Sequence, residues 1–133
     1  MIVDLGEAGA AAHYIKDIED GEGAWRWTGQ RPTLKIFVFA KDRLRFSTDF
    51  TVWETALQQT GPVELSFFVN DRLLGKVRYA KPGYQHFEKP LPDGCVIPDA
   101  DNTVGMAIDK LYTAPQDGKK FGVILTRIGF EPQ

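Results

Sequence analysis

The stretch "GAWRWTGQRPTLKIFVF", residues 23–39, places two tryptophans one residue apart at the start of an apolar run. In a β-strand, side chains at positions i and i+2 lie on the same face of the sheet. Trp25 and Trp27 therefore point the same way, and Arg26 points to the opposite face. Two interpretations follow: the tryptophans form a stacking platform for a ligand, or they are part of the core.

Working outward from this stretch, two runs have the composition of β-strands. Residues 33–40 ("TLKIFVFA") and 63–70 ("VELSFFVN") are rich in β-branched and aromatic side chains. In the second run the apolar residues alternate with polar ones, which is the pattern of a strand with one buried face. The alternating apolar residues are Val63, Leu65, Phe67 and Val69.

A hairpin is predicted in "FFVNDRLLGKVRY", residues 67–79, with Asn70-Asp71 as its turn. Both residue types tolerate the positive φ angles of tight hairpin turns. Further strands are expected at 2–5, 83–91, 102–113 and 121–130, and short helices at 7–15 and 52–59. Strand-length runs separated by turn signals predict an all-β fold, an antiparallel two-sheet β-sandwich of the jelly-roll type with about eight strands.

The size and composition indicate one soluble domain spanning residues 1–133. Hydrophobic residues make up 43% of the chain and charged residues 26%, so a packed core can form. The net charge is −2 without a basic cluster, which argues against nucleic acid as the main partner. The N-terminus lacks the pattern of a signal peptide, and no apolar run is long enough to span a membrane. The localisation stays open, and a domain of a larger extracytoplasmic protein is one expectation.

No catalytic motif is evident in the sequence. The two histidines, His13 and His86, are not joined to a nucleophile or to a metal-ligand pattern. The glycines in "VDLGEAGAAA", residues 3–12, lack the third glycine and the βαβ setting of a dinucleotide-binding loop. We therefore expect a non-catalytic domain.

Acidic loops raise the possibility of a structural calcium ion. "KDIEDGEG", residues 16–23, and "PDADN", residues 98–102, are rich in carboxylates, and calcium takes six to eight oxygen ligands. The ligands expected for such a site are Glu19, Glu22 and Asp109. The spacing does not match an EF-hand, and the alternative is that these loops are solvated turns.

Aromatic side chains in turn-flanked segments suggest a carbohydrate site. Sugars present apolar C–H faces bordered by hydroxyl groups, so their sites combine an aromatic surface with a few orienting polar groups. Trp53 and Tyr84 are the expected stacking residues, with Arg72 and Asp71 at the hairpin tip as weaker candidates. The alternative is that Trp53 closes the end of the sandwich and the tyrosines pack over loops.

Three segments resemble the galactose-binding-like jelly-roll domains. They are "VDLGEAG…YIKDIEDGEGAWRWTG", "FFVNDRLLGKVRY" and "YTAPQDGKKFGVILTRIGF". The likeness is nearest to accessory β-sandwiches of bacterial glycosyltransferases and other polysaccharide-handling proteins. The matching residues are Asp4, Gly6, Glu19 or Glu22, Trp27, Thr28, Val69, Asn70, Gly75, Gly122 and Ile128; Asp71 stands where the hairpin glycine is usual.

The resemblance implies the jelly-roll fold and two functions that the fold hosts. One is a non-catalytic carbohydrate-binding module that binds oligo- or polysaccharide, alone or in a larger glycan-active protein. The other is a structural or protein-interaction accessory domain without a small ligand. The resemblance also implies that Trp27 is a core residue, with Trp25 on the same side and half exposed near the strand end.

Overall fold

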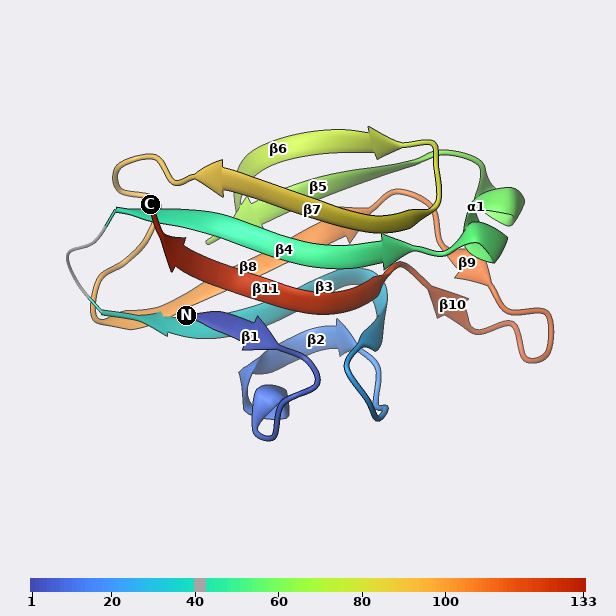
Figure 1. Cartoon of the computed structure of the whole chain (residues 1–133), viewed down its shortest axis with the longest axis horizontal. Helices are drawn as coiled ribbons and strands as arrows, with labels where there is room; N and C mark the ends of the chain where they lie inside the picture. The colour runs from blue at the N-terminus through green and yellow to red at the C-terminus, as the bar shows by residue number, and fades with distance from the viewer. Residues whose placement is uncertain (40–42) are drawn as a thin grey trace.

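The chain folds as an antiparallel β-sandwich in the computed structural model, which describes residues 1–39 and 43–133 (Figure 1). The strands are β1 (Ile2–Asp4), β2 (Tyr14–Ile18), β3 (Arg26–Val38), β4 (Leu44–Val52), β5 (Val63–Val69), β6 (Arg72–Tyr79), β7 (Gly83–Pro90), β8 (Ala100–Ile108), β9 (Tyr112–Thr113), β10 (Lys120–Phe121) and β11 (Ile124–Pro132). Two short helices complete the chain, the 3₁₀-helix η1 (Ala10–His13) and α1 (Glu54–Thr60). The predicted all-β jelly-roll class is confirmed.

The strands form two layers that share β3. The first sheet runs β1, β11, β4 and β7, and the second runs β2, β3, β8, β5 and β6. The beginning of β3 pairs with β11 of the first sheet through Trp27 and Ile124, whereas its second half pairs with β8. Strand β3 therefore crosses from one sheet to the other. Helix α1, β9 and β10 lie together at one end of the sandwich, at the right of Figure 1.

The core lies between the two sheets and is rich in phenylalanine. Alternate residues of each strand point inward because successive side chains of a strand face opposite sides. The largest fully buried side chains are Phe46, Phe50, Phe67, Phe130, Leu5, Leu34, Ile36, Leu65, Met106, Ile108, Leu125 and Ile128. These residues come from both sheets, so the core joins the two layers.

The predicted hairpin is confirmed. Strands β5 and β6 pair antiparallel, and Asn70 and Asp71 form the connection with φ angles of 48° and 63°. Positive φ at both turn residues gives the turn a twist that matches the twist of the paired strands. The Asn70 side chain also fixes the turn to β8, since its Nδ2 donates to Asn102 and its Oδ1 accepts from the Thr103 amide.

The secondary structure differs from the prediction in several parts. The helix expected at 7–15 is present only as the short 3₁₀-helix η1, which leads directly into strand β2, where Tyr14 and Ile18 pair with β3. The strand expected at 121–130 is broken at residues 122–123, between β10 and β11. The strand expected at 102–113 is interrupted at residues 109–111 and continues as β9. Strand β4 was not expected; its residues 46–50 are all buried, with Phe46 and Phe50 in the core. The short helix expected at 52–59 is found as α1.

No helix among the described residues combines the length and apolar character needed to cross a bilayer.

Candidate functional site

A row of four residues crosses the outer face of the first sheet near α1. Trp27 pairs with Ile124, Ile124 with Thr51, and Thr51 with Tyr84. Directly paired residues of antiparallel strands point to the same face. Phe50 is buried in the core next to Thr51 in sequence, so the row faces outward. The row therefore has an aromatic side chain at each end, Trp27 on β3 and Tyr84 on β7.

Aromatic rings cluster at the β3 side of this row. The ring centroids of Trp27 and Trp53 are 5.5 Å apart, and Trp27 lies 5.1 Å from Phe121 and 6.3 Å from Trp25. Trp53 also packs edge-on against the buried Tyr112 at 5.3 Å. Contacts of this kind hold rings in fixed positions and add to their burial energy. We call Trp25, Trp27, Trp53 and Phe121 the aromatic platform.

Two rings of the platform remain open to solvent. Trp25 is 44% exposed and Trp53 is 38% exposed, while Trp27 and Phe121 are partly buried. Trp53 directly follows β4 and directly precedes α1. Its ring is therefore positioned by the end of a strand and not by a flexible loop. A rigid and partly exposed indole is the type of surface on which an apolar ligand face can stack.

The expectation that Trp27 is a core residue is wrong. Thr28 is fully buried, and its hydroxyl accepts a hydrogen bond from the Val123 amide, so Thr28 is the inward-facing residue of this part of β3. Trp27 faces the other way because neighbouring residues alternate. Trp25 lies on the same side as Trp27 and is half exposed, as expected.

Polar side chains gather around Asp49 beside the platform. Asp49 on β4 pairs with His86 on β7 and Arg127 on β11, and only 6% of it is exposed. Its carboxylate accepts a hydrogen bond from the Tyr84 hydroxyl, and its Oδ1 lies 2.6 Å from His86 Nδ1. The Arg127 guanidinium lies 3.9 Å from the other carboxylate oxygen. We call Asp49, Tyr84, His86 and Arg127 the polar cluster.

These contacts orient the side chains of the cluster. The two ring nitrogens of His86 face two carboxylates, because Nδ1 lies against Asp49 and Nε2 lies 3.7 Å from Glu88 Oε1. The hydrogen bond to Asp49 raises the pKa of Tyr84 above its ordinary value of 10.0, because the carboxylate favours the protonated phenol; burial and the negative charge add to the shift. Tyr84 therefore stays protonated at neutral pH, and its exposed ring is held by Asp49.

A bulge in β11 contributes Arg127 to this surface. The register with β4 shifts between Leu125 and Arg127, so one extra residue is inserted before Arg127. A bulge changes which side chains face outward in the rest of a strand. Leu125 and Ile128 are both buried, and Arg127 between them is exposed on the outer face.

The combined surface presents two kinds of groups that suit contact with a ligand. The platform offers stacking area, and the cluster offers a hydroxyl, a guanidinium and an imidazole nitrogen next to it. Asp49 is committed to three neighbours and is nearly buried, so it orients the cluster. This combination of aromatic surface and oriented polar groups suits a neutral polyhydroxylated ligand.

The predicted ligand residues divide between two places. Trp53 belongs to the platform and Tyr84 to the polar cluster, and Tyr84 is 65% exposed. Asp71 and Arg72 are exposed at the β5–β6 hairpin, in the second sheet. Strand β5 begins after α1 and ends at this hairpin, so Asp71 and Arg72 lie at the opposite end from Trp53. Their assignment to the same site as Trp53 has no geometric support.

The carboxylates expected to bind calcium have other contacts. Glu19 forms an ion pair of 3.4 Å with Lys119, and Asp109 accepts a hydrogen bond of 2.8 Å from the Glu64 amide. Glu22 is exposed in the loop before β3. Within residues 1–39 and 43–133, no group of three or more His, Cys, Asp or Glu side chains is placed to hold a metal ion. A calcium site formed by these residues stays a prediction.

Asp49, Arg127 and the platform roles of Trp25 and Phe121 were not predicted from the sequence. Asp49 was missed because strand β4 was not expected, although Asp49 and Thr51 flank the apolar Phe50. Arg127 is displaced by the bulge, which no local pattern indicates. The position of His86 beside Tyr84 was predictable, because residues two apart in a strand lie on the same face.

Comparisons with known proteins bear on the fold. The sequence matches no family model and no curated protein. A family 35 carbohydrate binding module from an environmental isolate superposes with a TM-score of 0.52 and 11% identity, over 100% of this chain and 97% of the module. The chain shares its fold. The CBM36-1 domain of a multidomain xylanase from the hindgut metagenome of Trinervitermes trinervoides gives 0.50 and 10%, over 97% and 95%.

A third similar structure shows the same architecture inside a much larger protein. Dimeric latent PorU from Porphyromonas gingivalis superposes with a TM-score of 0.52 and 11% identity, over 96% of this chain and 12% of PorU. At these identities the comparisons establish the β-sandwich, which resembles carbohydrate-binding modules. Function has to be argued from the surface of this chain.

Proposed function

We propose that this protein is a non-catalytic carbohydrate-binding module that holds an oligo- or polysaccharide on the outer face of its first sheet. The aromatic platform stacks against the C–H face of a sugar, and the polar cluster contacts the hydroxyl groups of the same or the next unit. The observation that carries the proposal is the exposed Trp53 ring, fixed by Trp27 and Tyr112 next to a hydrogen-bonded Asp49–Tyr84 pair.

The rigidity of the aromatic platform and of the polar cluster favours binding. A ligand loses affinity when it must order the side chains that contact it. Trp53 is held between Trp27 and Tyr112, and Tyr84 and His86 are held by Asp49, so little ordering is needed.

A weak affinity per site is expected. A sugar hydroxyl exchanges bonds to water for bonds to protein, and each exchange contributes only about 0.5–1.5 kcal/mol. Stacking on the tryptophans must therefore supply most of the binding free energy. The similarity in fold to carbohydrate binding modules is consistent with this proposal.

The test is isothermal titration of the chain with xylohexaose, cellohexaose, mannohexaose and a galactan hexasaccharide. We expect binding of at least one of them, its loss in Trp53→Ala, and a weaker reduction in Tyr84→Phe. Phe37→Ala is the matched control, because Phe37 is an exposed aromatic residue on the second sheet. No heat with any oligosaccharide, and no shift of the melting temperature at millimolar sugar, would contradict the proposal.

A second candidate function is a bracing domain that contacts protein. Its support is an apolar groove of about 410 Å³ lined by Met1, Phe37, Phe39, Leu44 and Pro132, among others. The Phe37 and Phe39 rings are 4.9 Å apart and are 44% and 79% exposed. Neighbouring exposed aromatic residues are typical of interaction surfaces. If the titrations fail for every glycan, this function becomes the better explanation.

A further inference from the structure

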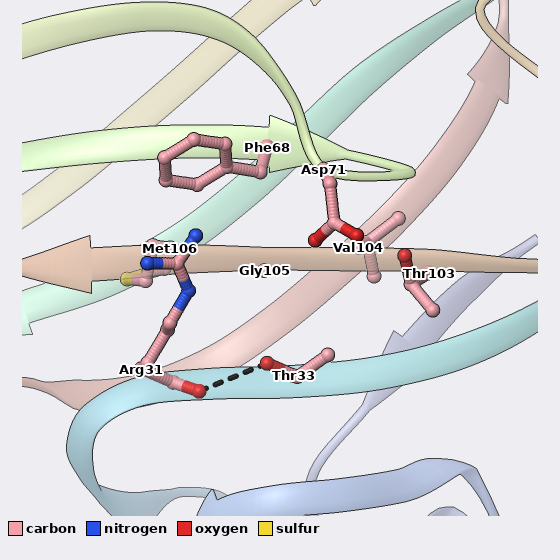
Figure 2. A pocket seen from close by; sticks show the side chains of 8 residues that line it. All are labelled: Arg31, Thr33, Phe68, Asp71, Thr103, Val104, Gly105 and Met106. Carbon is pink, nitrogen blue, oxygen red and sulfur yellow. Dashed lines mark hydrogen bonds between the residues drawn. The ribbon is translucent and has the colours of Figure 1, made fainter.

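The outer face of the second sheet has a small recess that is separate from the platform (Figure 2). Gly105 on β8 pairs with Thr33 on β3 at one side and with Phe68 on β5 at the other. Leu34 and Phe67, their sequence neighbours, are fully buried, so Thr33 and Phe68 face outward. Gly105 places no side chain between them, and all three residues line the recess.

Glycine is required at the floor of the recess. A Cβ atom added to Gly105 would lie 2.4 Å from the Pro32 carbonyl oxygen. That distance is far below van der Waals contact, and the obstructing atom belongs to the backbone. The floor is therefore bare backbone in any folded form of this sequence.

A positive group stands at one side of the recess. The Arg31 guanidinium carbon lies 4.7 Å from the centroid of the Phe68 ring, a cation–π contact. Within the described residues, the guanidinium forms neither an ion pair nor a hydrogen bond. Its N–H groups are therefore free to donate to a ligand, while the Phe68 ring holds it in place.

A negative group stands at the other side. Asp71, at the tip of the β5–β6 hairpin, directs its carboxylate toward the recess in Figure 2. No ion pair joins it to Arg31 or to any other described residue. Thr103 and Thr33 line the same recess, and the Thr33 hydroxyl donates to the Arg31 carbonyl oxygen. A guanidinium and a carboxylate thus border one recess on the sheet surface.

We propose that this recess is a second carbohydrate-binding site, which takes the edge of a single sugar unit. The recess has a volume of about 20 Å³, room for one hydroxyl-sized group. Arg31 donates to the sugar oxygens, and Asp71 accepts from a neighbouring pair of hydroxyls. This inference rests on the proposed function, since it assigns the same ligand class to a different face.

The charges select this ligand class. A phosphate or a simple carboxylate would suit Arg31 but would be repelled by Asp71, and a cation would meet the reverse problem. A hydroxyl group donates and accepts, so a sugar satisfies both sides at once. The outer faces of the two sheets point away from each other. A module with both sites can therefore hold two chains, or two segments of one chain, and link them.

The experiment is amide-resolved NMR of the whole chain, titrated with the hexasaccharides named above and with the methyl glycosides of xylose, glucose, mannose and galactose. We expect two separate groups of shifted signals, one at the Trp53 indole and one at the amides of Phe68, Thr103 and Gly105. Arg31→Ala and Asp71→Asn should each weaken binding at the recess about tenfold or more, as loss of a charge-assisted hydrogen bond does. They should leave the Trp53 signal's titration unchanged.

Lys35→Ala is the matched control, because Lys35 is an exposed cation further along β3 that does not line the recess. Sugar-induced shifts only at Trp53 would overturn the second site and leave the proposed function standing. Shifts only at the recess would uphold the second site and remove the platform from the function. No shift with any sugar would overturn both. Shifts at the recess with glycine but with no sugar would show a zwitterion site and overturn this assignment.

Discussion

Two groups of aromatic side chains in this protein have similar chemistry and different surroundings. The inner group, Phe46, Phe50, Phe67 and Phe130, lies between the sheets and is closed on all sides. The outer group is the aromatic platform, which packs on one side and faces solvent on the other. Both groups have ring pairs about 5–6 Å apart. Ring contacts alone therefore do not identify a core, because a second sheet must also cover the rings.

The largest effect is expected from Phe50→Ala. Phe50 is fully buried and packs against Phe67 and Tyr79, so its removal leaves a cavity. We expect the free energy of unfolding to fall by about 3–5 kcal/mol, measured by urea denaturation. A change similar to that of an exposed-site variant such as Phe37→Ala would break the distinction between the inner and outer groups.

A smaller loss is expected for Trp27→Ala. Trp27 contacts three other rings but is only partly buried, and no second sheet covers it. Its removal should lower the free energy of unfolding by about 2 kcal/mol, from lost ring contacts and partial burial. A loss as large as that of Phe50→Ala would mean that the platform is a part of the core.

Trp53→Ala should separate binding from stability. We expect at least a tenfold loss of oligosaccharide affinity, about 1.4 kcal/mol, since the exposed ring is the proposed stacking surface. The free energy of unfolding should fall by less than in Trp27→Ala, because Trp53 lies at a strand end and is more exposed. Isothermal titration and urea denaturation measure the two effects. If Trp53→Ala lowers the free energy of unfolding by as much as it lowers the binding free energy, Trp53 has a structural role.

The smallest expected effect is a change in the pKa of Tyr84. Asp49→Asn removes the carboxylate that raises the pKa of Tyr84, so this pKa should fall toward 10.0. Carbon NMR of the tyrosine rings, assigned with Tyr84→Phe, measures the shift. The raised pKa also sets a sign for stability: the Tyr84–Asp49 bond stabilises the fold below pH 10, and this contribution is lost as pH rises through the folded-state pKa.

A matched control for this titration is Asp101→Asn, an exposed carboxylate on the second sheet. It should leave the pKa of Tyr84 unchanged. If Asp49→Asn also leaves it unchanged, the hydrogen bond does not hold in solution, and the polar cluster is less ordered than the platform.

Much of the fold was predictable because strand signals are local. The alternation in residues 63–69 and the Asn70-Asp71 turn are written within a few positions, and both were confirmed. The helix expected at 7–15 is found only over residues 10–13, because pairing with β3 makes residues 14–18 a strand. The candidate site was only half predictable: Trp53 and Tyr84 were named, and Asp49 and Arg127 were not.

The sequence by itself determined the all-β class, the hairpin and the separation of inward from outward side chains along most strands. These follow from a period of two and from turn residues that tolerate positive φ. Only the tertiary structure decided that Trp27 faces outward, because that depends on where β3 crosses between the sheets. It also decided that Asp49, His86 and Arg127 meet, since three strands distant in sequence and one bulge bring them together.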